Sequence, residues 1–235
     1  MISCNYKGRL GNLLFQDVSM SILAEKFNLK VDSYTEYLPL RMNLYNSGSI
    51  SNENLEKVND DNFLNILKSK NIKNGIYLDG YFQNKDFVLE YEEKIRSQFY
   101  LDYEEVDKDD VFIHVRMGDL ANMFPWQSID YFKEALSKIN YRKIYISSDD
   151  LNNVSAPHHK LVQDLISEFN MIFYLNKPAE TINFAKNFNN LILSQGTFSW
   201  WIGFLSRAEN IYFPKGGPIW HGDIFVFDNW NAIEV

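Results

Sequence analysis

The sequence contains very little cysteine, and this scarcity excludes several kinds of protein. Cys4 is the only cysteine among 235 residues, so no disulfide can form within the chain and no cage of thiolates can hold zinc. A chain without disulfides is typical of a reducing compartment. Histidine is scarce too, and two of the four histidines are adjacent, at 158 and 159. Their side chains cannot share one helix face, so a histidine zinc site is not expected.

Long apolar runs are also lacking. No stretch approaches the roughly 20 apolar residues that cross a bilayer. Residues 1–7 do not show the charged and then apolar layout of a signal peptide. We therefore expect a soluble, cytoplasmic protein that does not span a membrane and whose contact with a membrane, if any, is peripheral.

Positive charge is in deficit, since 23 Lys and Arg residues stand against 31 Asp and Glu residues and the formal net charge is −8. A protein that binds nucleic acid needs a broad basic surface, so nucleic acid is not an expected partner. Any bound anion must instead meet a local cluster of donors. Apolar residues are plentiful, at 46% of the chain, which is ample for the core of one large domain or two small ones.

The second half of the sequence repeats one pattern, in which an apolar strand is followed by a polar loop and an amphipathic helix. The expected strands are 111–115, 143–147, 171–175, 191–194 and 210–213, and the expected helices are 129–139, 158–169, 179–190 and 198–208. This repetition predicts βα units on a parallel sheet, with the loops after successive strands along one edge.

The first half is less regular. Strands are expected at 2–5, 31–33 and 76–82 and helices at 12–27, 61–70 and 85–100, whereas the asparagine-rich segment 34–62 shows no clear period. Acidic residues crowd 102–110, which is the expected linker. The sequence therefore predicts two α/β domains, over residues 1–105 and 106–235.

An arginine directly follows the most apolar strand, in the segment 114–119 (HVRMGD). Ligands of open α/β sheets bind just beyond such strand ends, and the planar, permanently charged guanidinium matches two phosphate oxygens. Arg116 is therefore the first candidate for phosphate binding. The alternative is that Arg116 pairs with Asp119 and ties down the loop, while His114 is a buried, hydrogen-bonded core residue.

The loop after the next strand carries Ser148, Asp149 and Asp150. A carboxylate here can accept hydrogen bonds from a base or a ribose, but Ser and Asp are also favoured at helix caps and turns for local reasons. A metal site is not expected, because adjacent carboxylates point in different directions and no third ligand is evident.

The loop at 194–201 (SQGTFSWW) combines a free turn at Gly196 with Thr197 and Ser199 near a helix N-terminus. Helix N-termini bind anions through their N–H groups and the helix dipole. Trp200 and Trp201 lead into an apolar run, so we expect them to be core residues rather than a platform for a sugar.

At the N-terminus, Gly8, Gly11 and Asn12 lie in a turn from strand to helix. This turn has neither the glycine spacing of a dinucleotide fingerprint nor the lysine of a P-loop. The glycines allow a ligand to approach the backbone, and Asn12 serves either as a helix cap or to orient a substrate hydroxyl.

Five segments carry a resemblance to a known family: 8–16 (GRLGNLLFQ), 79–83 (DGYFQ), 114–119 (HVRMGD), 148–150 (SDD) and 197–201 (TFSWW). In this order they resemble the α-1,2-fucosyltransferases of glycosyltransferase family 11 and, more distantly, the α-1,6- and protein O-fucosyltransferases. The resemblance covers most of the chain.

The resemblance implies a GT-B-like fold of two Rossmann-like halves, with an acceptor side in residues 1–105 and the nucleotide-sugar site in residues 106–235. It also implies GDP-β-L-fucose as the donor, no required metal, and transfer with inversion to a glycan hydroxyl. An α-1,2 linkage on a galactose-like acceptor is the expected product.

The residues that the resemblance assigns to the donor lie in loops of the second half: His114, Arg116, Gly118, Asp149, Asp150, Thr197 and Ser199. Arg116 would hold the diphosphate, a carboxylate of 149–150 would face the nucleotide, and the two hydroxyls would lie at the phosphates. Gly8, Gly11 and Asn12 would line the cleft from the first half. Asp119 is the candidate general base, because it is the nearest carboxylate in sequence.

The chain also departs from the family pattern. Met117 stands where a second arginine is usual, Leu13 where glutamine is common, and Gln195 and Gly196 where Asn and Ser are usual. Two alternatives follow: a transferase that uses a different nucleotide sugar, and a non-catalytic module that binds a sugar or a nucleotide.

Overall fold

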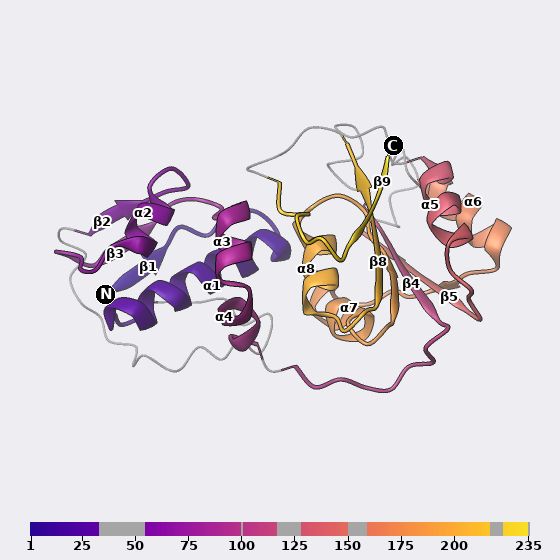
Figure 1. Ribbon diagram of the computed structural model, residues 1–235, viewed down its shortest axis with the longest axis horizontal. Coiled ribbons are helices and arrows are strands. Elements are labelled where there is room, and N and C mark those ends of the chain that lie inside the picture. Colours follow the sequence, from indigo (N-terminus) through magenta and orange to yellow (C-terminus); the bar gives the residue numbers. More distant parts are fainter. Residues whose placement is uncertain (33–54, 100, 117–127, 150–158, 217–222, 235) are drawn as a thin grey trace. The chain divides into compact units, whose positions relative to one another are not determined.

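A computed structural model of the chain (Figure 1) describes residues 1–32, 55–99, 101–116, 128–149, 159–216 and 223–234. Contacts divide the chain into two units. Unit 1 is Met1–Leu101 with Trp220–Val226, and unit 2 is Asp102–Ile219 with Phe227–Val235. Among the described residues, every helix is too short or too polar to cross a membrane.

The described part of unit 2 contains a six-stranded sheet in which every pairing is parallel. Its strands are β4 (Val111–Val115), β5 (Ile144–Ser148), β6 (Ile172–Phe173), β7 (Asn190–Ile192), β8 (Asn210–Lys215) and β9 (Asn231–Glu234). The five strands expected from the sequence are confirmed with small shifts at their ends, whereas β9 was not foreseen. The strand order is β6-β5-β4-β7-β8-β9, so the chain runs outward from β4 in one direction and then returns to continue in the other.

Helices cover both faces of this sheet (Figure 1). They are α5 (Ile129–Ser137), α6 (His159–Phe169), α7 (Pro178–Ala185) and α8 (Thr197–Leu205). All four expected helices are present, but those expected at 179–190 and 198–208 end earlier, at Ala185 and Leu205. Val111, Ile113 and Val115 pack in one core cluster with residues of α5 and α6. Phe112 and His114 point to the other face, toward the α7 and α8 side. All five residues of β4 are buried, as the continuous apolar run requires.

The strand order reverses between β4 and β7. In open α/β sheets, such a switch point leaves a crevice at the carboxyl ends of the two strands, where ligands bind. The loops that follow β4 and β7 begin at Arg116 and Leu193. The fold therefore places Arg116 and the start of α8 at the position where a parallel sheet is able to bind a ligand.

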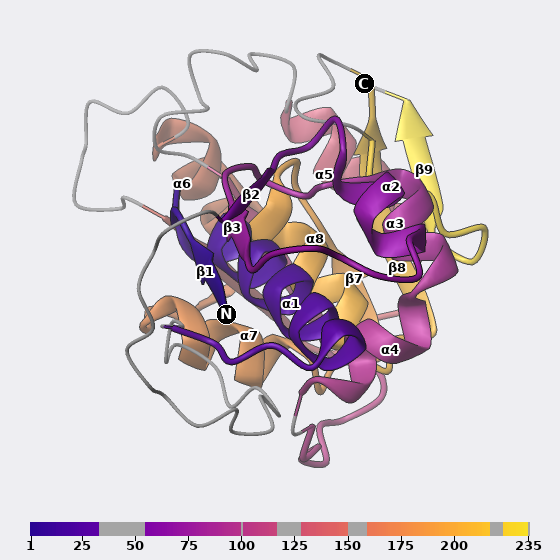
Figure 2. The same ribbon diagram turned by 90° about the vertical axis from the view of Figure 1, so that its left-hand side faces the viewer.

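Unit 1 has a smaller parallel sheet, in the order β1-β3-β2, with Val31 bridged to Ile2 beside β1. Its elements are β1 (Ile2–Cys4), α1 (Leu10–Phe27), β2 (Glu56–Val58), α2 (Phe63–Lys68), β3 (Ile76–Leu78), α3 (Lys85–Glu90) and α4 (Glu92–Ser97). Figure 2 shows α1 beside this sheet. The strand β2 was not foreseen, because three residues with two charges carry no apolar alternation.

Three expected boundaries in unit 1 were wrong. The helix expected at 12–27 begins at Leu10, because the positive φ of 85° at Gly8 turns the chain before it. The strand expected at 76–82 ends at Leu78, and Phe82 adopts a left-handed φ of 57°. The helix expected at 85–100 is two helices, with Tyr91 at φ −115° between them.

Gly203 is required for the packing of α8. A Cβ atom at this position would lie 2.8 Å from Leu193 Cδ1 and 2.8 Å from Trp230 Cη2. We expect Gly203→Ala to lower the free energy of unfolding by about 1–3 kcal/mol, because an overpacked core is strained. In an open helix the same change is stabilising by about 1 kcal/mol.

The sign of the change in the free energy of unfolding, measured by urea unfolding, decides between these two cases. Leu175→Ala is the control, because Leu175 is 68% exposed and its loss is expected to change stability by no more than about 0.5 kcal/mol. A Gly203→Ala protein as stable as the wild type would contradict this account of the packing.

Candidate functional site

Parallel register places the ends of β4 and β5 side by side in unit 2. Val115 pairs with Ser148, so Arg116 and Asp149 are the next residues on the two strands. Their side chains form an ion pair and are 14% and 23% exposed. The arginine and one of the two carboxylates singled out in the sequence therefore meet at the sheet edge.

The predicted site residues Gly118, Asp119 and Asp150 lie outside the described residues, and so does Met117. The proposed pairing of Arg116 with Asp119 therefore stays a prediction. Among the partners that the structure does describe for this guanidinium is Asp149.

The backbone at the end of β4 is held by two serines. Ser194 Oγ, from the loop after β7, accepts a hydrogen bond of 2.8 Å from the Arg116 N–H. Ser148 Oγ donates to the Val115 carbonyl at 2.7 Å. Ser194 was part of the loop noticed in the sequence but was not among the predicted site residues, because a hydroxyl gives no sign of a partner 78 positions away.

His114 is a buried, hydrogen-bonded residue, only 3% exposed. Its Nδ1 lies 2.6 Å from Ser199 Oγ, and its ring centroid is 5.0 Å from that of Phe198. Burial, with a smaller contribution from the Arg116 charge, lowers the pKa of His114 to about 3. The imidazole is therefore neutral at physiological pH.

The start of α8 joins this edge of the sheet. Gly196 takes a φ of 104°, which L side chains rarely adopt, and α8 begins at Thr197. Gln195 anchors the loop by donating from Nε2 to the Pro214 carbonyl at 2.7 Å. An α-helix N-terminus carries partial positive charge, which favours an anion.

Trp200 and Trp201 are core residues, as expected. Both are fully buried, and their rings contact each other with centroids 4.9 Å apart. The aromatic pair therefore anchors α8 and is not a surface for stacking a sugar.

In unit 1, the turn before α1 is held by Gln16. Its amide accepts from the Lys7 N–H at 2.9 Å and donates to the Lys7 carbonyl at 2.8 Å, as a neighbouring strand would. A Cβ atom at Gly8 would lie 2.2 Å from Asn12 Nδ2. Gly8 is therefore required both for its positive φ and for the space that the Asn12 amide occupies.

Asn12 is not the helix cap that one interpretation of the sequence predicted. The cap position of α1 is Arg9, and Asn12, one residue after Gly11, lies in the first turn of the helix. Its Oδ1 accepts a 2.9 Å hydrogen bond from Nε2 of Gln83, a side chain that is 5% exposed. Gln83 was noticed only as part of a motif, because its contact with Asn12 spans 71 positions.

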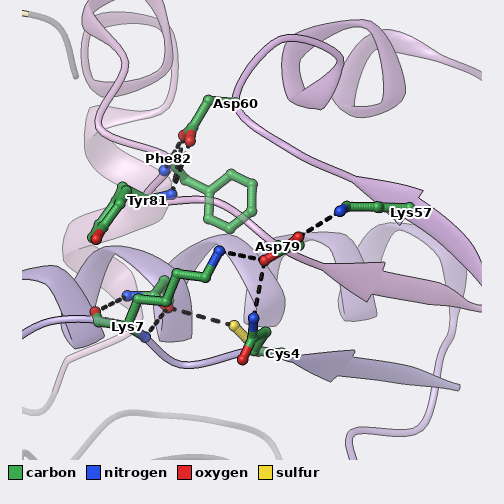
Figure 3. A network of polar contacts seen from close by, with 9 residues as sticks. Cys4, Lys7, Lys57, Asp60, Asp79, Tyr81 and Phe82 are labelled. Carbon is green, nitrogen blue, oxygen red and sulfur yellow. Dashed lines mark hydrogen bonds and ion pairs between the residues drawn. The ribbon is translucent and has the colours of Figure 1, made fainter.

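Asp79 collects three donors at the end of β3 (Figure 3). It forms ion pairs with Lys7 and, at 2.5 Å, with Lys57, and it accepts a 3.0 Å hydrogen bond from Asn5 Nδ2. Lys57 and then Lys7 hold the pKa of the Asp79 carboxyl well below its usual range. Because a general base needs a pKa near the working pH, Asp79 is suited to organising this edge and not to accepting a proton.

A second carboxylate shapes the turn after Asp79. Asp60 accepts hydrogen bonds from the backbone N–H groups of Tyr81, at 3.0 Å, and Phe82, at 2.5 Å (Figure 3). A Cβ atom at Gly80 would lie 2.8 Å from Asp60 Oδ2, so glycine is needed there. This turn buries Phe82 completely and brings Gln83 to Asn12.

Within the described ranges, no group of three or more His, Cys, Asp or Glu residues is arranged to hold a metal ion. The thiol of Cys4 is unsuited to chemistry, since burial and then the Asp17 charge raise its pKa to about 12.

Comparison with known proteins gives a family match. The family model described as "Glycosyl transferase family 11" matches residues 42–217, which is most of the chain and includes the segment 114–119 and the start of α8. No curated protein and no solved structure matches the chain.

The buried His114 predicts a pH dependence of stability. Because its pKa falls from 6.5 to about 3 on folding, the unfolded chain binds one more proton than the folded chain between those values. The contribution is complete above pH 6.5. Below it, the free energy of unfolding falls by about 1.4 kcal/mol per pH unit.

We expect His114→Gln to make the pH dependence of stability shallower by about one proton between pH 6.5 and 4.5. The free energy of unfolding at each pH is measured by urea unfolding, followed by tryptophan fluorescence. His159→Gln, at the start of α6, is the control for the loss of one imidazole. Parallel curves for wild type and His114→Gln would contradict the assignment of a neutral, buried imidazole.

The turn held by Asp60 predicts that Asp60 and its neighbour Asp61 contribute differently to the free energy of unfolding. Asp60→Ala leaves the N–H groups of Tyr81 and Phe82 without their acceptor, and we expect the free energy of unfolding to fall by about 1–3 kcal/mol. Asp61→Ala is the matched control, because the described hydrogen bond of Asp61 is made by its backbone N–H. Equal effects of the two substitutions in urea unfolding would show that the carboxylate of Asp60 does not hold the turn.

Proposed function

The chain belongs to glycosyl transferase family 11, and we propose that it moves L-fucose from GDP-β-L-fucose to a glycan hydroxyl with inversion. Membership makes the protein a glycosyltransferase, and fucosyl transfer is the activity that the family implies. The acceptor we propose is a galactose-like sugar, which receives an α-1,2 linkage. A cytoplasmic setting, with at most peripheral contact with a membrane, is part of the same proposal.

The observation that supports this proposal is the group of donors at the switch point of unit 2. Arg116 follows β4, and its backbone is tied to Ser194 in the loop before α8. A guanidinium has five N–H donors, so it can bind a carboxylate such as Asp149 and a phosphate together. Thr197 and Ser199 lie in the first turn of α8, whose partial positive charge favours phosphate.

These groups suit the departure of a diphosphate. The acceptor oxygen attacks C1 of the fucose from the face opposite the phosphate, and the bond from C1 to the β-phosphate oxygen breaks. GDP leaves with the electron pair, and a base takes the hydroxyl proton. Negative charge grows on the leaving group, so a fixed cation stabilises the transition state more than the substrate.

Arg116 is the proposed cation, and no metal is required in this proposal. Asp119 is proposed as the general base and Asn12 as the residue that orients the acceptor hydroxyl. The two units would act as the two halves of a GT-B enzyme, with the nucleotide in unit 2. Gly118 and Asp150 keep their proposed places beside the donor, and Gly8 and Gly11 keep theirs on the acceptor side.

A different nucleotide sugar is the second candidate donor, because Met117 and Gln195 depart from the family pattern. A thermal-shift panel of GDP-, UDP- and dTDP-sugars tests it, since a ligand that binds only the folded state raises the melting temperature. Stabilisation by GDP-fucose alone would reject this alternative.

Arg116→Ala is expected to lower transfer by at least about 100-fold, the usual cost of losing a group that stabilises developing charge. Fucosylated β-galactosides, measured by mass spectrometry, and released GDP are the two readouts. Arg142→Ala is the matched control. Arg142 forms two hydrogen bonds of 3.0 Å with Asp110 at the amino ends of the strands, and its loss should leave transfer intact.

Three results would count against the proposal. A wild-type protein that neither fucosylates the panel nor releases GDP above background would reject it. Full activity in Arg116→Ala would reject the role of the cation. A protein that binds the donor but never turns it over would favour a non-catalytic binding module.

A further inference from the structure

Three buried side chains form a closed hydrogen-bond group next to the backbone of Arg116. Ser199 Oγ lies 2.6 Å from His114 Nδ1, Ser194 Oγ lies 3.3 Å from the same nitrogen, and the two serine oxygens are 2.9 Å apart. His114 is 3% exposed and both serines are fully buried. Water therefore has little access to these atoms, and the donors and acceptors must satisfy one another.

The backbone decides the direction of these hydrogen bonds. The Arg116 N–H can only donate, so Ser194 Oγ accepts it, and the Ser194 hydroxyl proton must find another acceptor. If Ser194 donates to Ser199 and Ser199 donates to His114 Nδ1, every donor in the group has an acceptor.

The reverse direction of these hydrogen bonds leaves one donor without an acceptor. A proton on His114 Nδ1 would donate to Ser199, and Ser199 would then donate to Ser194. The Ser194 hydroxyl, which already accepts from Arg116, would have no acceptor among its described contacts. An unsatisfied buried hydroxyl is costly, so the first direction is favoured.

We propose that Ser194 and Ser199 are positioning residues that hold His114 as the Nε2–H tautomer, and that this N–H donates to an acceptor oxygen of the bound nucleotide. The second clause rests on the proposed function, whereas the first rests on hydrogen bonds alone. In the described part of the chain, the hydrogen bonds of the His114 ring are made by Nδ1, and none is made by its Nε2.

The tautomer matters because an acceptor oxygen of a nucleotide needs a hydrogen facing it. The other neutral tautomer would turn a lone pair of Nε2 toward that oxygen, and the two would repel. Since burial keeps the imidazole uncharged, only one ring nitrogen carries a proton, and the serines select which one. The same Ser194 oxygen also holds the backbone of Arg116, so one group sets both a neutral donor and a charged donor.

Nitrogen NMR of the intact protein, labelled with ¹⁵N in the histidine rings, tests the first clause. Long-range ¹H–¹⁵N correlations distinguish a protonated from an unprotonated ring nitrogen, and His114→Gln identifies the signals. We expect an unprotonated Nδ1 and a protonated Nε2. A protonated Nδ1, alone or with Nε2, overturns the proposal without any measurement of activity.

Variants test the role of the serines. The double variant Ser194→Ala/Ser199→Ala removes both hydroxyls that reach Nδ1, and we expect a mixture of tautomers. Ser199→Thr, made in the wild-type protein, keeps a hydroxyl at this position and should keep the single Nε2–H form. The control is Ser206→Ala at the end of the same helix, where the hydroxyl donates to the Gly203 carbonyl at 2.7 Å. An unchanged tautomer in the double variant would overturn the positioning role, and the wild-type spectrum stands even if that variant misfolds.

Titration with GDP, inorganic pyrophosphate and guanosine tests the second clause. We expect GDP to shift the Nε2 resonance, and the two fragments show whether the acceptor oxygen lies on the phosphates or on the nucleoside. Ser194→Ala/Ser199→Ala should weaken GDP binding by about 10-fold, the lower end of the effect of removing a partner that orients a metal-binding histidine, and Ser206→Ala should not. GDP binding that leaves Nε2 unmoved overturns this clause alone, whereas a wild-type protein that binds no GDP overturns both this clause and the proposed function.

Discussion

The parallel register of β4 with its two neighbours is the constraint on which the candidate site depends. Backbone hydrogen bonds pair Val115 with Ser148 on one side and Ile113 with Ile192 on the other. These pairings bring the strand ends to one edge and turn His114 toward the α8 face. A slip of one residue would exchange the two faces of the strand, and it would move the imidazole away from both serines and into the cluster under α5 and α6.

Charged and neutral groups are separated by their access to water. Arg116 and Asp149 lie at the sheet edge, where each keeps part of its side chain in contact with water and pairs with the other. His114 lies on β4 and is almost fully buried. It is neutral because burial disfavours its charged form. In unit 1, Asp60 accepts hydrogen bonds from two backbone N–H groups, and Asp79 forms ion pairs with Lys7 and Lys57. Each unit thus has a charged pair or cluster at the carboxyl end of a parallel strand, but its partners differ.

Much of the fold could be predicted from the sequence, because strands and helices of the second half have strong and distinct apolar periods. The elements that were predicted wrongly lie where the local sequence carries no clear signal. The strand β2 is short and charged, and the break between α3 and α4 falls at Tyr91, which carries no local signal such as glycine or proline. The turn before α1 is held by Gln16, whose amide hydrogen-bonds to the Lys7 backbone, and a local pattern does not show which backbone a buried amide will bind.

The sequence by itself determined the family, the alternation of strands and helices, and the position of an arginine directly after the most apolar strand. These features depend on residue type and on neighbours a few positions away. Only the tertiary structure decided that Arg116 meets Asp149 and that His114 meets two serines, which are 80 and 85 positions distant. Those pairings arise from strand order and burial, and the protonation of an imidazole follows from the hydrogen bonds around it. Such hydrogen bonds exist only once distant segments have packed together.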